Sequence, residues 1–507
     1  MKKTAILLMI ITILSKIMGF ARDITLSYFF GASYITDAYL ISITIPMVIF
    51  GFVGVGIASG YIPMYSQIEK AQGTKEGLKF TNNLTNIMLV ITTIIFILGL
   101  IFTVPIVKLF ASGFEGVALD LAVKFSRISL FGMYFTGLVS IFNSYLQIKG
   151  NYIVPAILGF PMNLITIIVI ILSSKGDILL LAIGSLISSG SQLIIVLFYA
   201  YKMGYKYSGI LEINNINLRK MMYIAFPAIV GSSVNQINVL VDRTVASGIV
   251  EGGITALNYA GKLNGFIQGI FVLSITTALF PIISKMAAEN DINGLKKTLS
   301  ESISSVNLLV IPATIGFMIF SEPIVAMVFG RGEFSSEAQV LTSAALFYYS
   351  LGMLGFGLSE VLSRAFYALQ DTKTPAIYSA IAVTINIVLN IILSSFMGIS
   401  GLALATSISA LISTVLLFLN LRKKIGFFSL RNMMISLLKI ITASLGMGVV
   451  SKLTYINLSM NISQNLSLVI SIALGVMLYL ILIYCMKIEE VNVLIRMFRT
   501  KLAKSKK

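Results

Sequence analysis

The sequence predicts an all-helical protein that crosses a membrane about fourteen times. Only 11% of its residues are charged, and its mean hydropathy is +0.95. Apolar runs of roughly 20 residues, the length that spans a bilayer as a helix, recur along the whole chain. Lys and Arg gather in the short segments between these runs, as in polytopic membrane proteins. The chain is therefore expected to be an integral membrane protein, with the bilayer and no nucleic acid among its partners.

Fourteen helices are predicted, and the basic residues indicate their orientation. The helices cover residues 4–30, 33–62, 82–104, 120–148, 153–173, 178–202, 220–248, 254–286, 300–321, 338–368, 375–397, 400–421, 432–454 and 464–487. With both termini cytoplasmic, most Lys and Arg residues of the connecting segments fall on the cytoplasmic side. The opposite side holds Lys108, Lys124, Arg127, Lys175, Arg331 and Lys452. This asymmetry favours an even number of spans.

Both ends of the chain carry basic residues. Lys2 and Lys3 precede an apolar run that has no small-x-small cleavage site, so this run is predicted to be an uncleaved first helix. The tail, residues 488–507, is basic and is predicted to lie on anionic lipid headgroups.

The composition excludes several kinds of chemistry. The sequence has no histidine and no tryptophan, and Cys485 is its only cysteine. Disulfides, cysteine-rich metal sites and histidine-based catalysis are therefore excluded. A phosphate-binding GxxxxGK[ST] loop is absent as well, so the chain is not expected to hydrolyse ATP.

Short motifs recur at a spacing of about 218–220 residues, which predicts two parallel halves. Ile-Pro-Met-Tyr-Ser at 62–66 resembles Phe-Pro-Ile-Ile-Ser at 280–284, and Pro-Ile-Val at 105–107 recurs at 323–325. Pro155-Ala156 recurs as Pro375-Ala376, and Ile35-Thr36 as Ile254-Thr255. Each half holds six helices, so both have the same orientation. Parallel repeats of this kind are typical of transporters with a substrate site between the halves. The predicted domains are two six-helix lobes (1–210 and 211–425), two further helices (426–487) and the tail (488–507).

Charged residues within the predicted helices point to a central cavity. They lie in equivalent helices of the two halves: Lys16, Arg22, Asp23 and Asp37 in the first, and Asp242, Arg243 and Lys262 in the second. Each costs about 2.5–3.5 kcal/mol at bilayer depth unless it faces protein, water or an ionic ligand. A cavity that is positive near Lys16, Arg22 and Lys262 would suit a phosphate-bearing substrate. Alternatively, Arg22 pairs with Asp23 or Asp37 and only holds helices together.

Two motifs resemble the MurJ (MviN) family of lipid II flippases. One is Ser15-Lys16-x-x-Gly19-Phe20-x-Arg22-Asp23, followed by Phe30-Gly31-Ala32 and Thr36-Asp37-Ala38. The other runs from Arg364 to Pro375 and contains Phe-Tyr-Ala-Leu-Gln-Asp-Thr-Lys-Thr-Pro. The similarity covers nearly the whole chain, including the last two helices.

The resemblance implies a fold of the multidrug/oligosaccharidyl-lipid/polysaccharide exporter superfamily, with two six-helix lobes in a V. It also implies export of the undecaprenyl-pyrophosphate-linked peptidoglycan precursor across the bacterial cytoplasmic membrane. We expect the protein to work by alternating access, as a monomeric transporter and not as an enzyme. The family's cavity residues map onto Lys16, Arg22, Lys262 and Asp37, with Ser15 and Asp23 beside them. Helices 432–454 and 464–487 would then form a groove for the lipid tail, or would only pack against the core.

The sequence departs from the family pattern at several positions. Phe50 and Val55 stand where many members carry Arg and Glu in the second helix, and Lys replaces Arg at positions 16 and 262. Some members bind sodium, and the matching positions here are Asp242, Asn386, Asn390, Thr406 and the Leu402 carbonyl. Asn390 is an aspartate in those members, so this site would have one anionic ligand fewer. No cofactor other than this sodium ion is predicted.

Three other functions remain open from the sequence. The first is a flippase for another undecaprenyl-linked glycan, of capsule or O-antigen type. The second is a cation-coupled drug exporter, which the basic cluster disfavours. The third is a membrane-bound prenyl-phosphate transferase, which needs paired carboxylates for magnesium. Asp371 is single, and Glu289 and Asp291 lie in a polar loop, so this enzyme is disfavoured as well.

Overall fold

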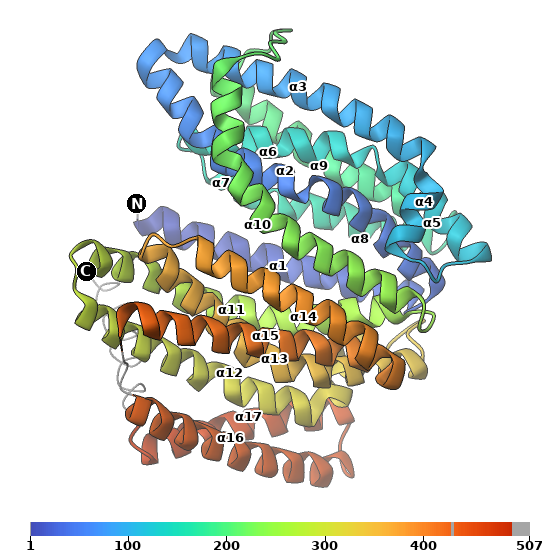
Figure 1. Ribbon diagram of the computed structural model, residues 1–507. Coiled ribbons are helices and arrows are strands. Elements are labelled where there is room, and N and C mark those ends of the chain that lie inside the picture. Colours follow the sequence, from blue (N-terminus) through green and yellow to red (C-terminus); the bar gives the residue numbers. More distant parts are fainter. Residues whose placement is uncertain (1, 427–429, 489–507) are drawn as a thin grey trace. The chain divides into compact units, whose positions relative to one another are not determined.

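The computed structural model describes residues 2–426 and 430–488, and over these residues the regular structure is entirely helical. In chain order the helices are α1 (Lys2–Phe30), α2 (Tyr34–Gln72), α3 (Thr74–Ile101), α4 (Thr103–Phe110), α5 (Gly116–Ser129), α6 (Gly132–Ile148), α7 (Ile153–Ile157), α8 (Gly159–Ser173), α9 (Leu180–Lys202), α10 (Ile216–Ser247), α11 (Gly253–Ala288), α12 (Ile292–Phe329), α13 (Ser336–Ala368), α14 (Lys373–Met397), α15 (Ile399–Ile425), α16 (Leu430–Ser459) and α17 (Gln464–Cys485) (Figure 1). The predicted basic tail lies outside the described residues.

The chain forms two compact units. The first contains α1 to α10 and the short segment Arg331–Ser335, and the second contains most of α11, from Ala256, and α12 to α17. The lobe boundary that we predict at residue 210 follows the sequence repeat, whereas the packing groups α10 with the first unit. Helix α10 packs closely on α2, because Gly56 and Gly60 of α2 leave room for the Ile229 and Met221 side chains of α10.

The repeat found in the sequence is also present in the helix boundaries. Helices α2, α3, α5, α7 and α9 begin at residues 34, 74, 116, 153 and 180. Helices α11, α12, α13, α14 and α15 begin at residues 253, 292, 336, 373 and 399. Each pair is separated by 218 to 220 residues, the spacing of the recurring motifs. The two halves therefore share one succession of helices along the chain.

The predicted count of fourteen spans is not confirmed. Among the described residues, twelve helices are long and apolar enough to cross a membrane, or thirteen if the bent pair α5 and α6 is one span. The predicted helix 120–148 is broken near Leu130 and bends by 40° there. The predicted helix 300–321 is longer at both ends: Asp291 caps α12 through the Gly294 N–H, and the helix continues past a kink at Phe320.

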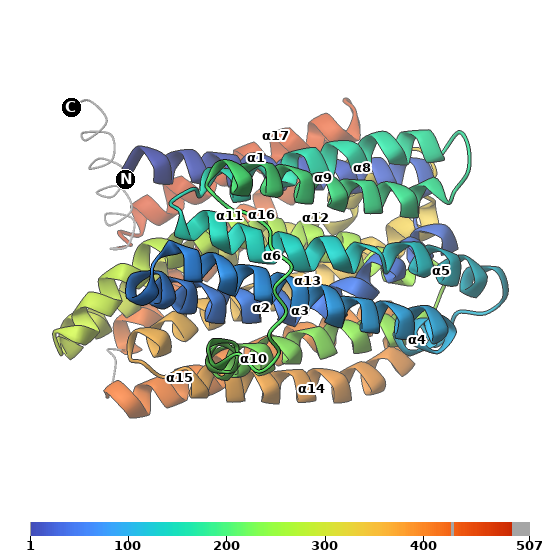
Figure 2. The same ribbon diagram turned by 90° about the horizontal axis from the view of Figure 1, so that it is seen from above.

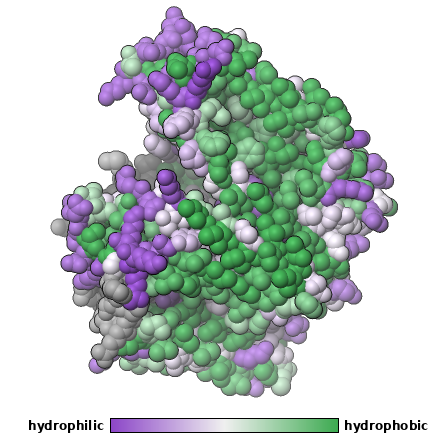
Figure 3. Space-filling model, viewed as in Figure 1, coloured by the Kyte–Doolittle hydropathy of each residue, from purple (hydrophilic) through white to green (hydrophobic). Residues whose placement is uncertain are grey.

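Apolar side chains cover much of the surface. On the face drawn in Figure 3, hydrophobic residues form broad areas along the helices and hydrophilic residues gather near helix ends. Helix α14 illustrates this pattern, since Ile377, Val388, Ile391 and Phe396 are all exposed. A soluble protein rarely exposes so much contiguous apolar surface. The surface confirms that this is a multi-pass membrane protein.

In two places in the first unit, a loop donates a backbone N–H to the end of a helix. The Glu333 N–H donates to the Tyr28 carbonyl oxygen at 2.9 Å, at the end of α1. The Gly113 N–H donates to Ser247 Oγ at 3.1 Å, at the end of α10. A Cβ on Gly332 would lie 2.1 Å from the Tyr28 oxygen, and one on Gly113 would lie 2.4 Å from the Ser247 oxygen. Gly113 and Gly332 are 219 residues apart, so each repeat has a loop glycine that lies close against the end of a helix.

Three asparagines of α3 hold the linker between α9 and α10. The Asn83 amide pairs with the Glu212 backbone in both directions, at 2.9 and 2.6 Å. Asn82 donates to the Lys206 carbonyl and accepts from the Tyr205 hydroxyl. Asn86 donates to the Ser208 and Ile210 carbonyls. The linker therefore follows a fixed path before α10 begins (Figure 2).

In the second unit, α16 and α17 pack side by side and against α12 (Figure 1). Small residues permit the close approach, because the Ser451 side chain fills the space beside Gly475. Ile440, Ala443, Tyr479 and other buried side chains form an apolar core with Leu308 and Ile311 of α12. Lys439 lies in α16, and its ammonium donates to the carbonyl of Met486, directly after α17, at 2.9 Å.

Candidate functional site

Arg22 lies in a polar cluster on α1. Its guanidinium donates to the Asp23 carboxylate at 2.7 and 3.0 Å, and to Asn163 Oδ1 of α8 at 3.3 Å. Asp23 is almost buried, and the Arg22 side chain is 25% exposed. The ion pair with Asp23 that we considered as an alternative is therefore present. A quarter of the Arg22 side chain stays exposed beside this pair.

The other predicted residues of α1 lie one to two turns before Arg22. The Lys16 side chain is exposed, and no hydrogen bond or ion pair joins it to a residue that the structure describes. Ser15 packs against Gly159 of α8, where an added Cβ would lie 2.0 Å from the Ser15 hydroxyl. Lys16 is thus exposed on α1, next to Ser15, which packs against α8.

Asp37 is buried, and its carboxylate accepts hydrogen bonds within the first unit. Its carboxylate accepts from the Gly252 N–H at 2.9 Å, from the Thr255 N–H at 2.8 Å and from the Thr255 hydroxyl at 2.5 Å. These donors lie at the start of α11, so Asp37 caps that helix from another element. Its side chain is only 2% exposed. The substrate contact that we predict for Asp37 stays a prediction, whereas its anchoring of the α10–α11 turn is visible.

The remaining predicted residues divide between the two units. Lys262 is exposed on α11 in the second unit, so it is not placed relative to Lys16 and Arg22. Asp242 accepts from Asn238 in the first unit. In the second unit, Asn386 donates to Thr406 Oγ1 at 3.2 Å, and Asn390 donates to Asn386 Oδ1 at 3.0 Å.

In the α14–α15 network Asn390 donates to Asn386, Asn386 donates to Thr406, and Thr406 Oγ1 donates to the Leu402 carbonyl. Asp242 lies in the other unit, so the sodium site as a whole stays a prediction. Among the described residues, no group of three or more His, Cys, Asp or Glu side chains could hold a metal ion.

The loop carboxylates considered for an enzyme have structural partners. Asp371 accepts from Lys424 at 2.5 Å and from the N–H and hydroxyl of Thr374. The Lys424 ammonium, more than the Thr374 donors, lowers the pKa of Asp371 to about 2 from its ordinary 3.8. Asp291 caps α12. These contacts give both carboxylates a role in loop geometry.

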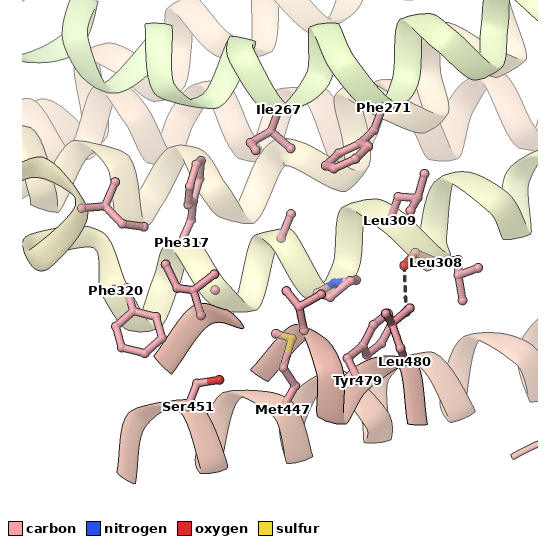
Figure 4. A pocket seen from close by; sticks show the side chains of 16 residues that line it. Ile267, Phe271, Leu308, Leu309, Phe317, Phe320, Met447, Ser451, Tyr479 and Leu480 are labelled. Carbon is pink, nitrogen blue, oxygen red and sulfur yellow. Dashed lines mark hydrogen bonds between the residues drawn. The ribbon is translucent and has the colours of Figure 1, made fainter. Parts of the chain in front are cut away.

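An apolar groove runs along the two C-terminal helices. It has a volume of about 380 Å³ and lies between α11, α12, α16 and α17. In Figure 4, Phe271, Phe317, Phe320, Met447 and Leu480 surround it. Its polar groups are few, and the Tyr479 hydroxyl is occupied by the Leu308 carbonyl at 2.7 Å. A long hydrocarbon chain fits such a lining.

The family model described as "Lipid II flippase MurJ" matches residues 26–472. This chain belongs to the MurJ family. The probable lipid II flippase MurJ of Buchnera aphidicola subsp. Baizongia pistaciae is 29% identical over 451 residues, 88% of each chain. A solved structure titled lipid II flippase MurJ, inward closed conformation, is 30% identical, with a TM-score of 0.82 over 94% of this chain and 98% of that one.

More distant transporters share the fold alone. An inward-facing multidrug resistance MATE family transporter of the MOP superfamily is 15% identical, with a TM-score of 0.70 over 81% of this chain and 94% of that chain. MurJ membership agrees with the resemblance in the two motifs and with the superfamily fold that it implies. It also places the chain in a family of transporters.

Sequence reasoning missed several residues of these sites. Asn163 was not singled out, although an amide in the apolar run of α8 is costly unless it has partners. The same signal marks Asn82 and Asn83, which are buried in α3. Gly252 and Thr255 could not be found as partners of Asp37, because a sequence separation of more than 200 residues carries no local signal.

Proposed function

We propose that this MurJ-family protein moves lipid II across the bacterial cytoplasmic membrane by alternating access. The match to the family over residues 26–472 carries the proposal. The exposed Lys16 and the partly accessible Arg22 supply cations for the pyrophosphate, and Lys262 adds a third from the second unit. Asp23, Ser15 and Asp37 position or line this region.

The lipid tail is assigned to the groove of α11, α12, α16 and α17. A polyprenyl chain gains about 25 cal/mol for each Å² of apolar surface that it removes from a polar environment. In a bilayer the tail is already in an apolar environment, so the groove guides the chain more than it attracts it. The groove has a volume of about 380 Å³, and its lining of aromatic and aliphatic side chains suits this role.

The proposal also covers the orientation in the membrane, the oligomeric state and the cofactors. Both termini face the cytoplasm, as the distribution of basic residues predicts. The protein acts as a monomer, catalyses no covalent chemistry and needs no organic cofactor. Sodium is the one ion to test, by comparing the unfolding temperature of the purified protein in sodium chloride and in choline chloride. No shift in that temperature would remove sodium from the proposal.

Depletion of the protein in its host tests the function directly. Lipid II should then accumulate on the cytoplasmic face, and wild-type protein should restore its export. The Arg22→Ala variant should fail to do so, because it removes a cation that faces the anionic substrate. Arg127→Ala is the matched control, since Arg127 is an exposed arginine on α5. Normal lipid II export with loss of another surface glycan would replace lipid II by that glycan as the substrate.

A further inference from the structure

The first unit contains a second, uncharged pocket between α2, α5, α6 and α9. Its volume is about 210 Å³. Four hydroxyl-bearing residues line it, Ser129, Thr136, Ser185 and Ser189, and no charged side chain does. The four hydroxyls come from three helices, α5, α6 and α9.

Local features of the backbone open this space. Ser129 ends α5 and Gly132 begins α6, so the 40° bend between these helices lies at the pocket wall. Gly51 and Gly132 contribute no side chains, and a Cβ on Gly132 would meet no atom within 4 Å. Met47, at the edge of the pocket, is 57% exposed. The pocket is thus a built cavity that solvent or a ligand can reach.

The hydroxyls present acceptors to the pocket, because their protons are already used. Thr136 donates to the Gly132 carbonyl at 3.0 Å. Ser185 donates to Ala182 at 2.7 Å and Ser189 to Ser185 at 3.0 Å, in each case to a backbone carbonyl. Ser129 donates to the Ser42 hydroxyl at 3.3 Å. A hydroxyl that donates its only proton keeps lone pairs for accepting.

This lining selects a ligand by its hydrogen-bond donors. No cation lines the pocket, which makes it unsuited to pyrophosphate, and its hydroxyls lie beside Ile43, Pro46, Met47 and Leu186, which gives the lining both polar and apolar parts. Sugar hydroxyl groups are neutral and donate, so they match an acceptor-lined wall. The pocket volume of about 210 Å³ is below the roughly 300–1,000 Å³ of pockets for drug-sized ligands. It therefore suits one sugar ring and not a whole glycopeptide.

We propose that this pocket binds a sugar ring of the lipid-linked substrate through Thr136, Ser185 and Ser189. The inference rests on the proposed function and extends it, because it separates glycan recognition from recognition of the pyrophosphate and of the tail. The polyprenyl pyrophosphate part is common to many lipid-linked glycans. The pocket is where a sugar-bearing lipid gains affinity over the bare carrier.

Two probes test the pocket with protein reconstituted in lipid nanodiscs. One is lipid II, and the other is undecaprenyl pyrophosphate, which has the same anion and tail but no sugar. In the variant Thr136→Val/Ser185→Ala/Ser189→Ala, lipid II should bind about tenfold more weakly, as expected for lost neutral hydrogen bonds. Binding of undecaprenyl pyrophosphate should be unchanged.

A matched control carries the same substitutions outside the pocket. Thr12→Val/Ser59→Ala/Ser66→Ala removes three hydroxyls that also donate to their own helix carbonyls. It should bind both probes as the wild type does. A second variant, Gly132→Leu, fills the pocket by volume and should weaken lipid II binding again, whereas Gly132→Ala should do so far less. Unfolding temperatures near that of the wild type show that each variant is folded.

The outcomes separate the pocket from the proposed function. Equal binding of lipid II by the wild type and both pocket variants overturns the pocket inference and leaves the flippase proposal intact. Equal weakening of both probes overturns it as well, because the pocket would then not distinguish the sugar. Failure of the wild type to bind lipid II, with normal binding of another lipid-linked glycan, overturns the assignment of lipid II itself.

Discussion

At the scale of single residues, Asp37 shows how a charged side chain is accommodated without a salt bridge. Its carboxylate accepts three hydrogen bonds from Gly252 and Thr255. Bonds to a charged group contribute about 1.5–3 kcal/mol each, and a buried donor without a partner costs a similar amount. The start of α11 is therefore fixed by a residue that belongs to α2.

Replacing Asp37 should loosen this turn. We expect Asp37→Ala to lower the free energy of unfolding by about 2–4 kcal/mol, because it leaves buried donors without acceptors. Hydrogen exchange at residues 250–256 should rise with it. Asp177→Asn is the control, since Asp177 accepts from Leu179 in an exposed loop. Unchanged exchange in Asp37→Ala would show that the turn is held by other contacts.

Asp371 should make stability depend on pH at the acid end. Its pKa in the folded protein is about 2, lowered chiefly by Lys424. A lowered pKa means that the stabilisation is complete above the ordinary value near 4 and is lost as the pH falls towards 2. Since the Lys424 side chain is 41% exposed, solvent screening limits the contribution to about 1–2 kcal/mol.

The comparison that checks this is between wild type and Asp371→Asn. Their unfolding temperatures in detergent should differ at pH 5 and converge as the pH approaches 2. Asp177→Asn should show no such convergence, because its carboxylate accepts only from a loop N–H in solvent. A constant difference between wild type and Asp371→Asn across this range would contradict the assignment.

At the scale of elements, the linker between α9 and α10 is held by side chains of α3. We expect Asn83→Ala to destabilise the protein by about 1–3 kcal/mol, because the Glu212 N–H and carbonyl both lose their partner. Limited proteolysis should cut residues 205–213 faster in this variant. Asn461→Ala is the control, since Asn461 makes one long contact in an exposed turn. Equal cleavage rates would mean that Asn82 and Asn86 suffice.

The apolar groove offers a second test at this scale. Gly316 of α12 lines it, and an added Cβ there meets no atom within 4 Å. Gly316→Leu should therefore fill the groove without a clash and slow lipid II transport several-fold with little change in unfolding temperature. Gly316→Ala, which adds one carbon, is the graded control. Normal transport by Gly316→Leu would place the lipid tail elsewhere.

The elements also show what a sequence can predict. The order of the helices, the repeat and the membrane class follow from apolar runs and recurring motifs, which are local signals. The break at Leu130 does not, because no proline marks it, and the continuation of α12 past Phe320 does not either, because Pro323 favours an end there and α12 kinks and continues instead. Pairings such as Arg22 with Asn163 depend on how helices pack, and periodicity carries no such information.

At the scale of the whole molecule, the single cysteine tests the topology. Cys485 ends α17 and is exposed. If both termini are cytoplasmic, a membrane-impermeant maleimide should label Cys485 in inverted vesicles but not in intact spheroplasts. As a control, the variant Lys452→Cys/Cys485→Ser should show the reverse pattern, since the distribution of basic residues predicts Lys452 on the opposite side. Labelling of Cys485 from outside would contradict a cytoplasmic C-terminus.

The loops that bind helix ends have a consequence for the order of synthesis. Glu333 binds the end of α1, and the segment Arg331–Ser335 belongs to the first unit although α11 and α12 separate it from the rest. A ribosome makes the chain from the N-terminus, so the first unit cannot be completed until residue 335 has left the tunnel. By then two helices of the second unit have been synthesised. The first unit therefore completes its folding only after part of the second has been made, and a chain that stops after α10 would lack the segment that binds the end of its own first helix.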